Sequence, residues 1–475
     1  MKKILAVVMC ALIAGSAVTL SGCGSDRSQA GSSAGSGEYH SSDDAQTKDT
    51  PEQAVSSGKV QATISAEEKD NEKVAERLSD FSCRLFTDIS CNESDKDNNV
   101  VVSPLSIYSA LSMCLNGAGG NTKTEMTEVL SACYGYGEDV LTKYDIDVLK
   151  AEQINSYFYD YMQGLETEGE SKTRLSVANS IWLNSDRSDI VFGDEFLSTG
   201  ESCYGAEIRR EHFKPSAAKK VNSWVSKNTD GMIDSIVDED DMKSSLVTIL
   251  LNAVAFDGEW AEPYYESDVQ KNTFTCSDGS QNTVDFMYST ESRYIDDGRA
   301  VGFIKDYKFD EYGTASRFSF IALLPNEDIG IDEYLSRFSN KSLSDAVNNA
   351  ENATVNAQLP KFDFDYDAAL VPYLQELGVH DAFDPVAADF SSLGKNSDSG
   401  DSGICIGDIK HKAKITVDEQ GTKAAAVTAI LMPDNAMAPI DTDYYEVNLN
   451  RPFVFAIYDN YENIPVFIGT VRTIE

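Results

Sequence analysis

Histidines and catalytic sequence motifs are both scarce in this chain. Only four histidines occur among 475 residues: His40, His212, His380 and His411. The part of the chain that is rich in apolar residues holds no Gly-x-Ser-x-Gly elbow, His-Glu-x-x-His helix, Walker loop or Gly-x-Gly-x-x-Gly turn. Pairs of acidic residues are abundant, but on a chain this acidic they are typical of a solvated face. We therefore expect that the protein is not an enzyme, and we assign no catalytic residue.

Positive charge is also in short supply. Lys and Arg number 39 against 78 Asp and Glu, which gives a formal net charge of −39. Nucleic acids and anionic membrane surfaces both need a basic face on their partner, so the charge balance argues against either. It favours solubility but does not by itself indicate a function.

Paired cysteines are not expected to organise the fold. Of nine cysteines, Cys10 and Cys23 lie in the N-terminal segment discussed below, and seven remain. Their spacing does not fit a zinc site, and an odd number leaves at least one unpaired, so their pairing stays open. We expect small buried hydrophobic residues, with no metal and no cofactor.

Residues 1–22 have the pattern of an export signal. Lys2 and Lys3 form a positive start, and the residues up to Leu20 are apolar or small. The run ends in Leu-Ser-Gly-Cys, which resembles a bacterial lipobox, so Cys23 is the expected lipidation site. An ordinary secretory signal and a short transmembrane anchor are the alternatives, although the apolar run is short for a span. Residues 23–70 follow as a Ser/Gly/Asp-rich tether with almost no large apolar residues.

Folded sequence begins near Asn71. Apolar residues recur there at helical spacing and predict an amphipathic helix, namely Val74, Leu78, Phe81, Leu85 and Ile89. A buried strand follows from residue 99 and is stopped by Pro104, with Ser103 or Ser106 as the cap of the next helix.

Sequence blocks in a fixed order resemble one protein family. The run 99–126 has the order strand, Ser-Pro-x-Ser, helix and Gly-Ala-x-Gly-x-Thr. Further blocks follow at residues 178–183, 204–207, 221–225, 229–233, 250–256, 359–362, 377–379 and 450–455. Together they resemble the serpins, inhibitors of serine proteases, over residues 71–475. With the N-terminal segment, the resemblance is to a bacterial, lipoprotein-type serpin.

The resemblance implies the fold and the domain organisation. We expect the serpin fold, a mixed α+β (α/β) architecture with about three β-sheets, eight to nine helices and an exposed reactive-centre loop at about residues 419–446. The chain then divides into a signal peptide (1–22), the lipidated Cys23 with a disordered tether (23–70), and a serpin domain (71–475).

The stretch 409–428 resembles the hinge of the reactive-centre loop, which inserts into the central sheet after cleavage. It starts as a strand and then becomes Ala-rich, so its residues alone are equally typical of a helix or a flexible linker. With a period of two, one set of side chains would face the core: Thr422, Ala424, Ala426 and Thr428. No charge or proline falls on that set, because Lys423 belongs to the other face. The hinge residues implied by the resemblance are Glu419, Gly421, Thr422, Ala424, Ala425, Ala426 and Thr428.

Two further sites follow from the resemblance. Positions matching Ser103, Ser106, Asn252 and His411 form a hydrogen-bonded cluster beneath the point where the central sheet parts. Buried polar groups need partners, so such a cluster can hold the sheet closed or open. For His411 alone, a satisfied structural histidine is the simpler interpretation. Trp260 matches a tryptophan under the first insertion point of the loop.

The position of the scissile bond follows from counting along the loop. Fourteen residues on from Gly421 is Asn435, which gives Asn435–Ala436 as the reactive bond. Counting back from the block at 450–452 gives a bond nearer Asp441, about 441 − 435 = 6 residues later. The hinge-side count is preferred because the inserted length decides where the protease ends up. No Arg or Lys lies between Ala424 and Ile440, which argues against trypsin-like targets.

The predicted function is suicide inhibition of an endopeptidase by a lipid-anchored, extracytoplasmic, monomeric protein on a bacterial membrane. Asn435 suits a cysteine protease that cuts after asparagine, and Ala436 or Met437 suits an elastase-like serine protease. The alternative is a non-inhibitory serpin-fold surface lipoprotein that acts as a carrier or binding protein. Such relatives carry bulky or charged hinge residues, and the small residues after Gly421 indicate the opposite.

Overall fold

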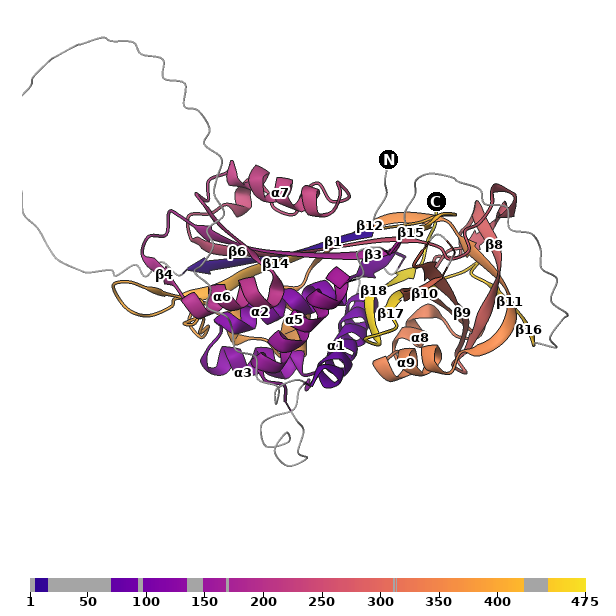
Figure 1. The fold of residues 1–475 in the computed structure, drawn as a ribbon, viewed down its shortest axis with the longest axis horizontal. Coiled ribbons are helices and arrows are strands. Elements are labelled where there is room, and N and C mark those ends of the chain that lie inside the picture. Colours follow the sequence, from indigo (N-terminus) through magenta and orange to yellow (C-terminus); the bar gives the residue numbers. More distant parts are fainter. Residues whose placement is uncertain are drawn as a thin grey trace, which may run out of the picture.

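The computed structural model of the protein describes residues 5–15, 70–92, 97–134, 148–167, 171–310, 312, 314–422 and 443–475. Two large β-sheets and a layer of helices make up the described part of the chain (Figure 1). The expected tether and most of the expected reactive loop lie outside these residues. No helix in the described ranges is both long and apolar enough to cross a membrane.

Nine α-helices occur in the described residues. They are α1 (Asn71–Asn92), α2 (Pro104–Gly117), α3 (Gly120–Leu130), α5 (Ala151–Thr167), α6 (Asp194–Tyr204), α7 (Ala217–Asn228), α8 (Ile331–Leu335), α9 (Asn340–Asn348) and α10 (Val371–Leu377). In Figure 1, α7 lies alone on one face of the central sheet, and α2, α5 and α6 cover the other face.

The central sheet has the strand order β12-β14-β1-β6-β3-β5, and β15 pairs with β6 off this path. Its strands are β1 (Leu5–Gly15), β3 (Arg174–Asn184), β5 (Glu207–Glu211), β6 (Leu246–Glu259), β12 (Phe362–Ala369), β14 (Ile404–Val417) and β15 (Gly421–Thr422). The strand β1 comes from the segment that the sequence predicts to be an export signal. It lies inside the sheet and runs antiparallel to both of its neighbours.

The second large sheet has the order β16-β11-β8-β9-β10-β17-β18-β2, with β7 added on β8. Its strands are β2 (Val100–Val102), β7 (Val269–Thr275), β8 (Gln281–Asp296), β9 (Ala300–Lys308), β10 (Ala315–Pro325), β11 (Glu351–Pro360), β16 (Tyr444–Asn448), β17 (Phe453–Asp459) and β18 (Ile464–Val471). A third, two-stranded sheet joins β4 (Ile190–Phe192) to β13 (Gly394–Asn396). The prediction of three sheets with eight to nine helices is therefore confirmed.

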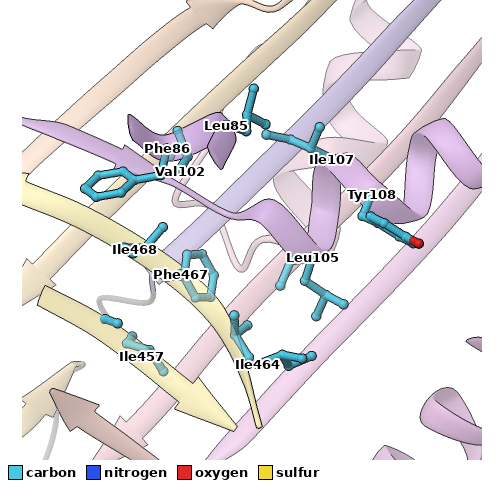
Figure 2. Packing of buried hydrophobic residues seen from close by; sticks show 14 of the residues in the cluster. Leu85, Phe86, Val102, Leu105, Ile107, Tyr108, Ile457, Ile464, Phe467 and Ile468 are labelled. Carbon is cyan, nitrogen blue, oxygen red and sulfur yellow. The ribbon is translucent and has the colours of Figure 1, made fainter. Parts of the chain in front are cut away.

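The local sequence explains where α1 and α2 form. All five apolar residues that predicted α1 are fully buried: Val74, Leu78, Phe81, Leu85 and Ile89. Ser103 caps α2 by accepting a hydrogen bond from the Ser106 amide, and Pro104 takes the first helical position, where its missing N–H costs nothing. Figure 2 shows Leu105, in the first turn of α2, beside Ile464 and Phe467 of β18. This packing joins the helix layer to the second sheet.

A buried ion pair ties β10 to β17. The Arg317 Nε lies 3.0 Å from the Asp459 Oδ1, and the two side chains are 4% and 0% exposed. The Tyr161 hydroxyl donates a further hydrogen bond to Asp459 at 3.2 Å. An ion pair at this depth depends on both partners, because either charge alone is costly to bury.

We predict that Asp459→Asn lowers the free energy of unfolding by about 3–5 kcal/mol, because it removes the buried carboxylate that pairs with the Arg317 charge. Urea denaturation measures the change. The matched control is Asp345→Asn, whose partner Lys341 is 83% exposed. Removing this exposed pair should cost less than about 0.5 kcal/mol. Equal shifts in the two variants would contradict the prediction.

Candidate functional site

β15 follows β14 in the chain and pairs with β6, so a strand that continued from β15 would lie between β6 and β14, and we call this position the slot. In this structure the slot is occupied by β1, whose Met9 lies opposite Asn252 on β6 and His411 on β14. Because neighbouring strands lie about 4.8 Å apart, one intervening strand holds β6 and β14 about 10 Å from each other. The central sheet is therefore in its parted form.

The expected loop hinge forms a tight turn that leads onto β6. Asp418 and Gly421 exchange backbone hydrogen bonds of 3.1 and 3.3 Å. Gly421 has a φ of +150°, and an added Cβ there would lie 2.0 Å from the Gly258 carbonyl oxygen. Only glycine fits that conformation and that close approach. The sequence alone marked Gly421 by its family position, and the structure supplies the steric reason.

Trp260 and Tyr264 anchor this turn through hydrogen bonds, and we call these two residues the hinge seat. The buried indole N–H of Trp260 donates to the Asp418 carbonyl at 2.9 Å, and its backbone N–H donates to the Gln420 carbonyl at 3.0 Å. The Tyr264 backbone N–H donates to the Glu419 carbonyl at 3.0 Å. Three successive carbonyl groups of the turn are thus held from one side, which fixes the direction in which the chain leaves it.

The side chain of Thr422 points into the core, as the period-two pattern predicted. It is fully buried, and its hydroxyl lies 2.5 Å from the Tyr307 hydroxyl. The Tyr307 ring stacks on Trp260 with centroids 4.7 Å apart. The sequence placed Gly421 and Thr422 in the exposed loop, and this is wrong for both residues. They form β15, since the backbone pairs with β6 and the hydroxyl needs its buried partner.

An ion pair holds Glu419, the first residue of the hinge, in place. Glu419 forms an ion pair with Lys361 at 2.5 Å. Burial raises the pKa of the Glu419 carboxyl, but the hydrogen bond and charge of Lys361 bring it below the ordinary value. The buried ammonium of Lys305 lies 4.5 Å from the ring centroid of Tyr264, whose backbone binds the turn, and 2.8 Å from Glu291. These contacts hold the turn without a covalent link.

The four residues of the predicted polar cluster come together at the middle of the slot. Ser106 donates a short hydrogen bond to the Asn252 carbonyl oxygen, and the Ser103 backbone N–H donates to the His411 Nε2 at 3.4 Å. Asn179, which the sequence did not assign to the site, accepts from the Asn252 amide at 2.8 Å. Asn179 lies in the sequence block 178–183, but no pattern in the sequence indicates its contact with Asn252.

His411 is held neutral in this cluster. Burial lowers its pKa from the ordinary value to about 3. Because Nε2 accepts the Ser103 N–H, the ring proton is placed on Nδ1, and Nδ1 has no hydrogen-bond partner among the described residues. A second proton would have to displace the Ser103 bond, which opposes ionisation as well.

Several predicted site residues lie outside the described part of the chain: Cys23, Ala424, Ala425, Ala426, Thr428, Asn435 and Ala436. At the two ends of the expected loop range of about 419–446, residues 421–422 form β15 and residues 444–446 belong to β16, which pairs with β11. Residues 423–442 lie outside the described part of the chain. Among the described residues, the seven cysteines of the expected domain form no disulfide, and all but Cys91 are buried.

Some residues of the site carry no sequence signal. Tyr307 and Lys361 reach the hinge across strand pairings that only the folded chain reveals. The Lys361 position was quoted with the block 359–362, but no pattern links it to Glu419. Long-range partners of this kind are beyond single-sequence reasoning.

We predict a pH dependence of stability that comes from His411. The unfolded histidine binds a proton below a pKa of about 6.5, whereas the folded one stays neutral down to about 3. The unfolded state therefore binds one more proton, and stability falls as pH falls, by about 1.4 kcal/mol per pH unit between roughly pH 6 and pH 4. Urea denaturation of the wild type and of His411→Gln should differ by this slope. His380→Gln, at an exposed histidine, is the control, and equal slopes in the wild type and His411→Gln would contradict the prediction.

Comparison with known proteins agrees with this geometry. The leukocyte elastase inhibitor of Xenopus tropicalis is 27% identical over 408 residues, covering 84% of this chain and 98% of that protein. An uncharacterized serpin-like protein of Methanosarcina acetivorans is 27% identical over 387 residues, covering 80% and 82%. Among solved structures, the thermophilic serpin tengpin in its native state superposes with a TM-score of 0.71 at 37% identity, covering 88% of this chain and 96% of tengpin.

The family model that matches is Serpin (serine protease inhibitor), and it covers residues 76–474. That match spans nearly the whole of the predicted domain 71–475 and includes both the hinge seat at Trp260 and the cluster around Asn252. The chain therefore belongs to the serpin family.

Proposed function

We propose that this serpin traps its target protease as a covalent acyl complex through insertion of its cleaved loop into the central sheet. The observation that carries the proposal is the position of Thr422. It is already paired with β6 as the first rung of a strand, with its side chain facing inward. A chain that continues in that direction enters the slot between β6 and β14.

The chemical step belongs to the protease. Its nucleophile attacks the Asn435 carbonyl, the Asn435–Ala436 bond breaks, and the new amine of Ala436 leaves with a proton. The acyl bond then links Asn435 to the protease. About a dozen loop residues would insert, each gaining a net hydrogen bond of about 0.5–1.5 kcal/mol, so the driving force is on the order of 10 kcal/mol with apolar burial added.

The target class follows from the loop sequence. Asn435 suits a cysteine protease that cuts after asparagine, and Ala436 or Met437 suits an elastase-like serine protease. The absence of Arg and Lys between Ala424 and Ile440 disfavours trypsin-like enzymes. Relatives named leukocyte elastase inhibitor support the elastase-like class.

The location also belongs to the proposal. Removal of residues 1–22 would leave Cys23 lipidated and the serpin domain tethered as a monomer outside the cytoplasmic membrane. The support is the sequence alone, namely the Lys2–Lys3 start, the apolar run and the Leu-Ser-Gly-Cys ending.

The test is to mix the processed chain, which starts at Cys23, with a panel of elastase-like, trypsin-like and asparagine-cutting proteases. We expect a complex with an elastase-like or asparagine-cutting enzyme that survives boiling in detergent. Mass spectrometry of the released peptide should place the cut after Asn435. Cleavage without any stable complex across the panel would instead support a non-inhibitory carrier or binding protein.

We predict that Thr422→Arg in the processed chain converts the inhibitor into a substrate. The protease should still bind and cut the loop, but burying an unpaired charge opposite Gly258 costs several kcal/mol and stops insertion. The ratio of cleaved to trapped chain measures the effect. Lys423→Arg, with the same side chain on the outward set, is the matched control and should trap normally. Undiminished trapping by Thr422→Arg would count against insertion.

A further inference from the structure

The strand β1 pairs through its backbone with both strands that border the slot, β6 and β14. Its residues pair with β6 from Leu5 opposite Phe256 onward, and with β14 from Ala6 opposite Lys414 onward. Figure 1 shows β1, in indigo, running along the sheet with β6 and β14. The pairing register shifts between Leu12 and Ile13 in the pairing with β14, and between Ile13 and Ala14 in the pairing with β6.

The side chains of β1 fit both layers of the molecule. Met9, Ala11 and Ile13 are fully buried in the main core. Cys10 and Leu12 point to the opposite face and join the smaller cluster that includes residues of α7. Alternate side chains therefore contact alternate faces, as in a regular central strand. The strand carries no charged residue that would oppose this burial.

The hinge and β1 use the same edge of β6, in the same direction. Thr422 lies opposite Gly258, and Leu5 lies opposite Phe256, with only Asp257 between these two partners. Both segments run antiparallel to β6. If β15 were extended in register, Ala424 would meet Phe256, the partner that Leu5 now has. The inserted loop and β1 therefore exclude each other.

We propose that Leu5–Gly15 closes the loop-insertion slot in the unprocessed chain, so that the chain cannot trap a protease until this segment is removed. The inference rests on the proposed function, because blocking matters only if the loop inserts. The same segment is the apolar part of the expected export signal, so processing at Cys23 would both release the chain and open the slot. A precursor would then be cut by a protease as a substrate.

The reactivity of the Cys10 thiol shows whether β1 occupies the slot, and this measurement needs no protease. Cys10 is 0% exposed in the sheet and would become accessible to reagent if β1 left it. Burial also raises the pKa of its thiol, which removes the reactive thiolate. Iodoacetamide labelling of the full-length chain, followed by peptide mapping, should show Cys10 protected by at least about 100-fold relative to the chain in urea. Labelling of Cys10 at the unfolded rate overturns the proposal.

A second experiment tests blocking in the full-length chain. Ala11→Asp places a carboxylate at a fully buried position of the main core and should expel β1. We expect Cys10 to become reactive and the variant to gain boiling-resistant complexes with the protease that the processed chain traps. Ala17→Asp puts the same change two residues beyond β1 and is the matched control, which should remain protected and be cut without trapping.

The outcomes separate this proposal from the one on which it rests. If the wild-type full-length chain traps as efficiently as Ala11→Asp while its Cys10 stays protected, the blocking role is wrong and the inhibitory function stands. If neither Ala11→Asp nor the processed chain traps any protease, the inhibitory function fails and the blocking role falls with it. Should Ala11→Asp not fold, Cys10 protection in the wild type still decides whether β1 fills the slot.

Discussion

The edges of β6 and β14 are the constraint on which this molecule depends. Each edge presents a row of backbone N–H and C=O groups that are buried under helices and must be paired. In the parted sheet, one strand between them pairs with both rows. In the structure that strand is Leu5–Gly15, which comes from a distant part of the chain. The segment that lies between β6 and β14 can therefore differ from one state of the molecule to another.

The hinge seat decides how any later occupant enters. Trp260 and Tyr264 hold three carbonyl groups of the turn, so Gly421 can meet β6 in one register only. Since side chains alternate across a strand, that register also decides which loop residues face the core. The contact of the buried Thr422 hydroxyl with Tyr307 fixes which face of the chain points inward at this end of β6. The alignment of an incoming strand with β6 therefore matters as much as the strength of its binding.

The sequence predicted the elements whose signals are local. The apolar spacing of α1, the proline start of α2 and the inward side chain of Thr422 all depend on near neighbours. By contrast, the apolar run at residues 5–15 has the same pattern as an export signal and as a buried strand, and hydropathy alone does not distinguish them. Tyr307 and Lys361 were missed for a related reason, because their roles arise from pairings between strands far apart in sequence. Their partners became visible only with the fold.

The polar cluster favours the loop over β1 as the occupant of the slot. Met9 offers His411 no good acceptor, and the His411 Nδ1 is without a hydrogen-bond partner among the described residues. Six residues on from Thr422 opposite Gly258, Thr428 would lie opposite Asn252 (258 − 6 = 252), and its hydroxyl would supply that acceptor. An unsatisfied buried group costs about 1–3 kcal/mol, which favours the loop. Apolar burial at the described positions does not offset this difference, because in the same register Met9 is larger than Thr428 whereas Ala11 is smaller than Ile430. As long as β1 pairs with both β6 and β14, the loop cannot use this polar advantage.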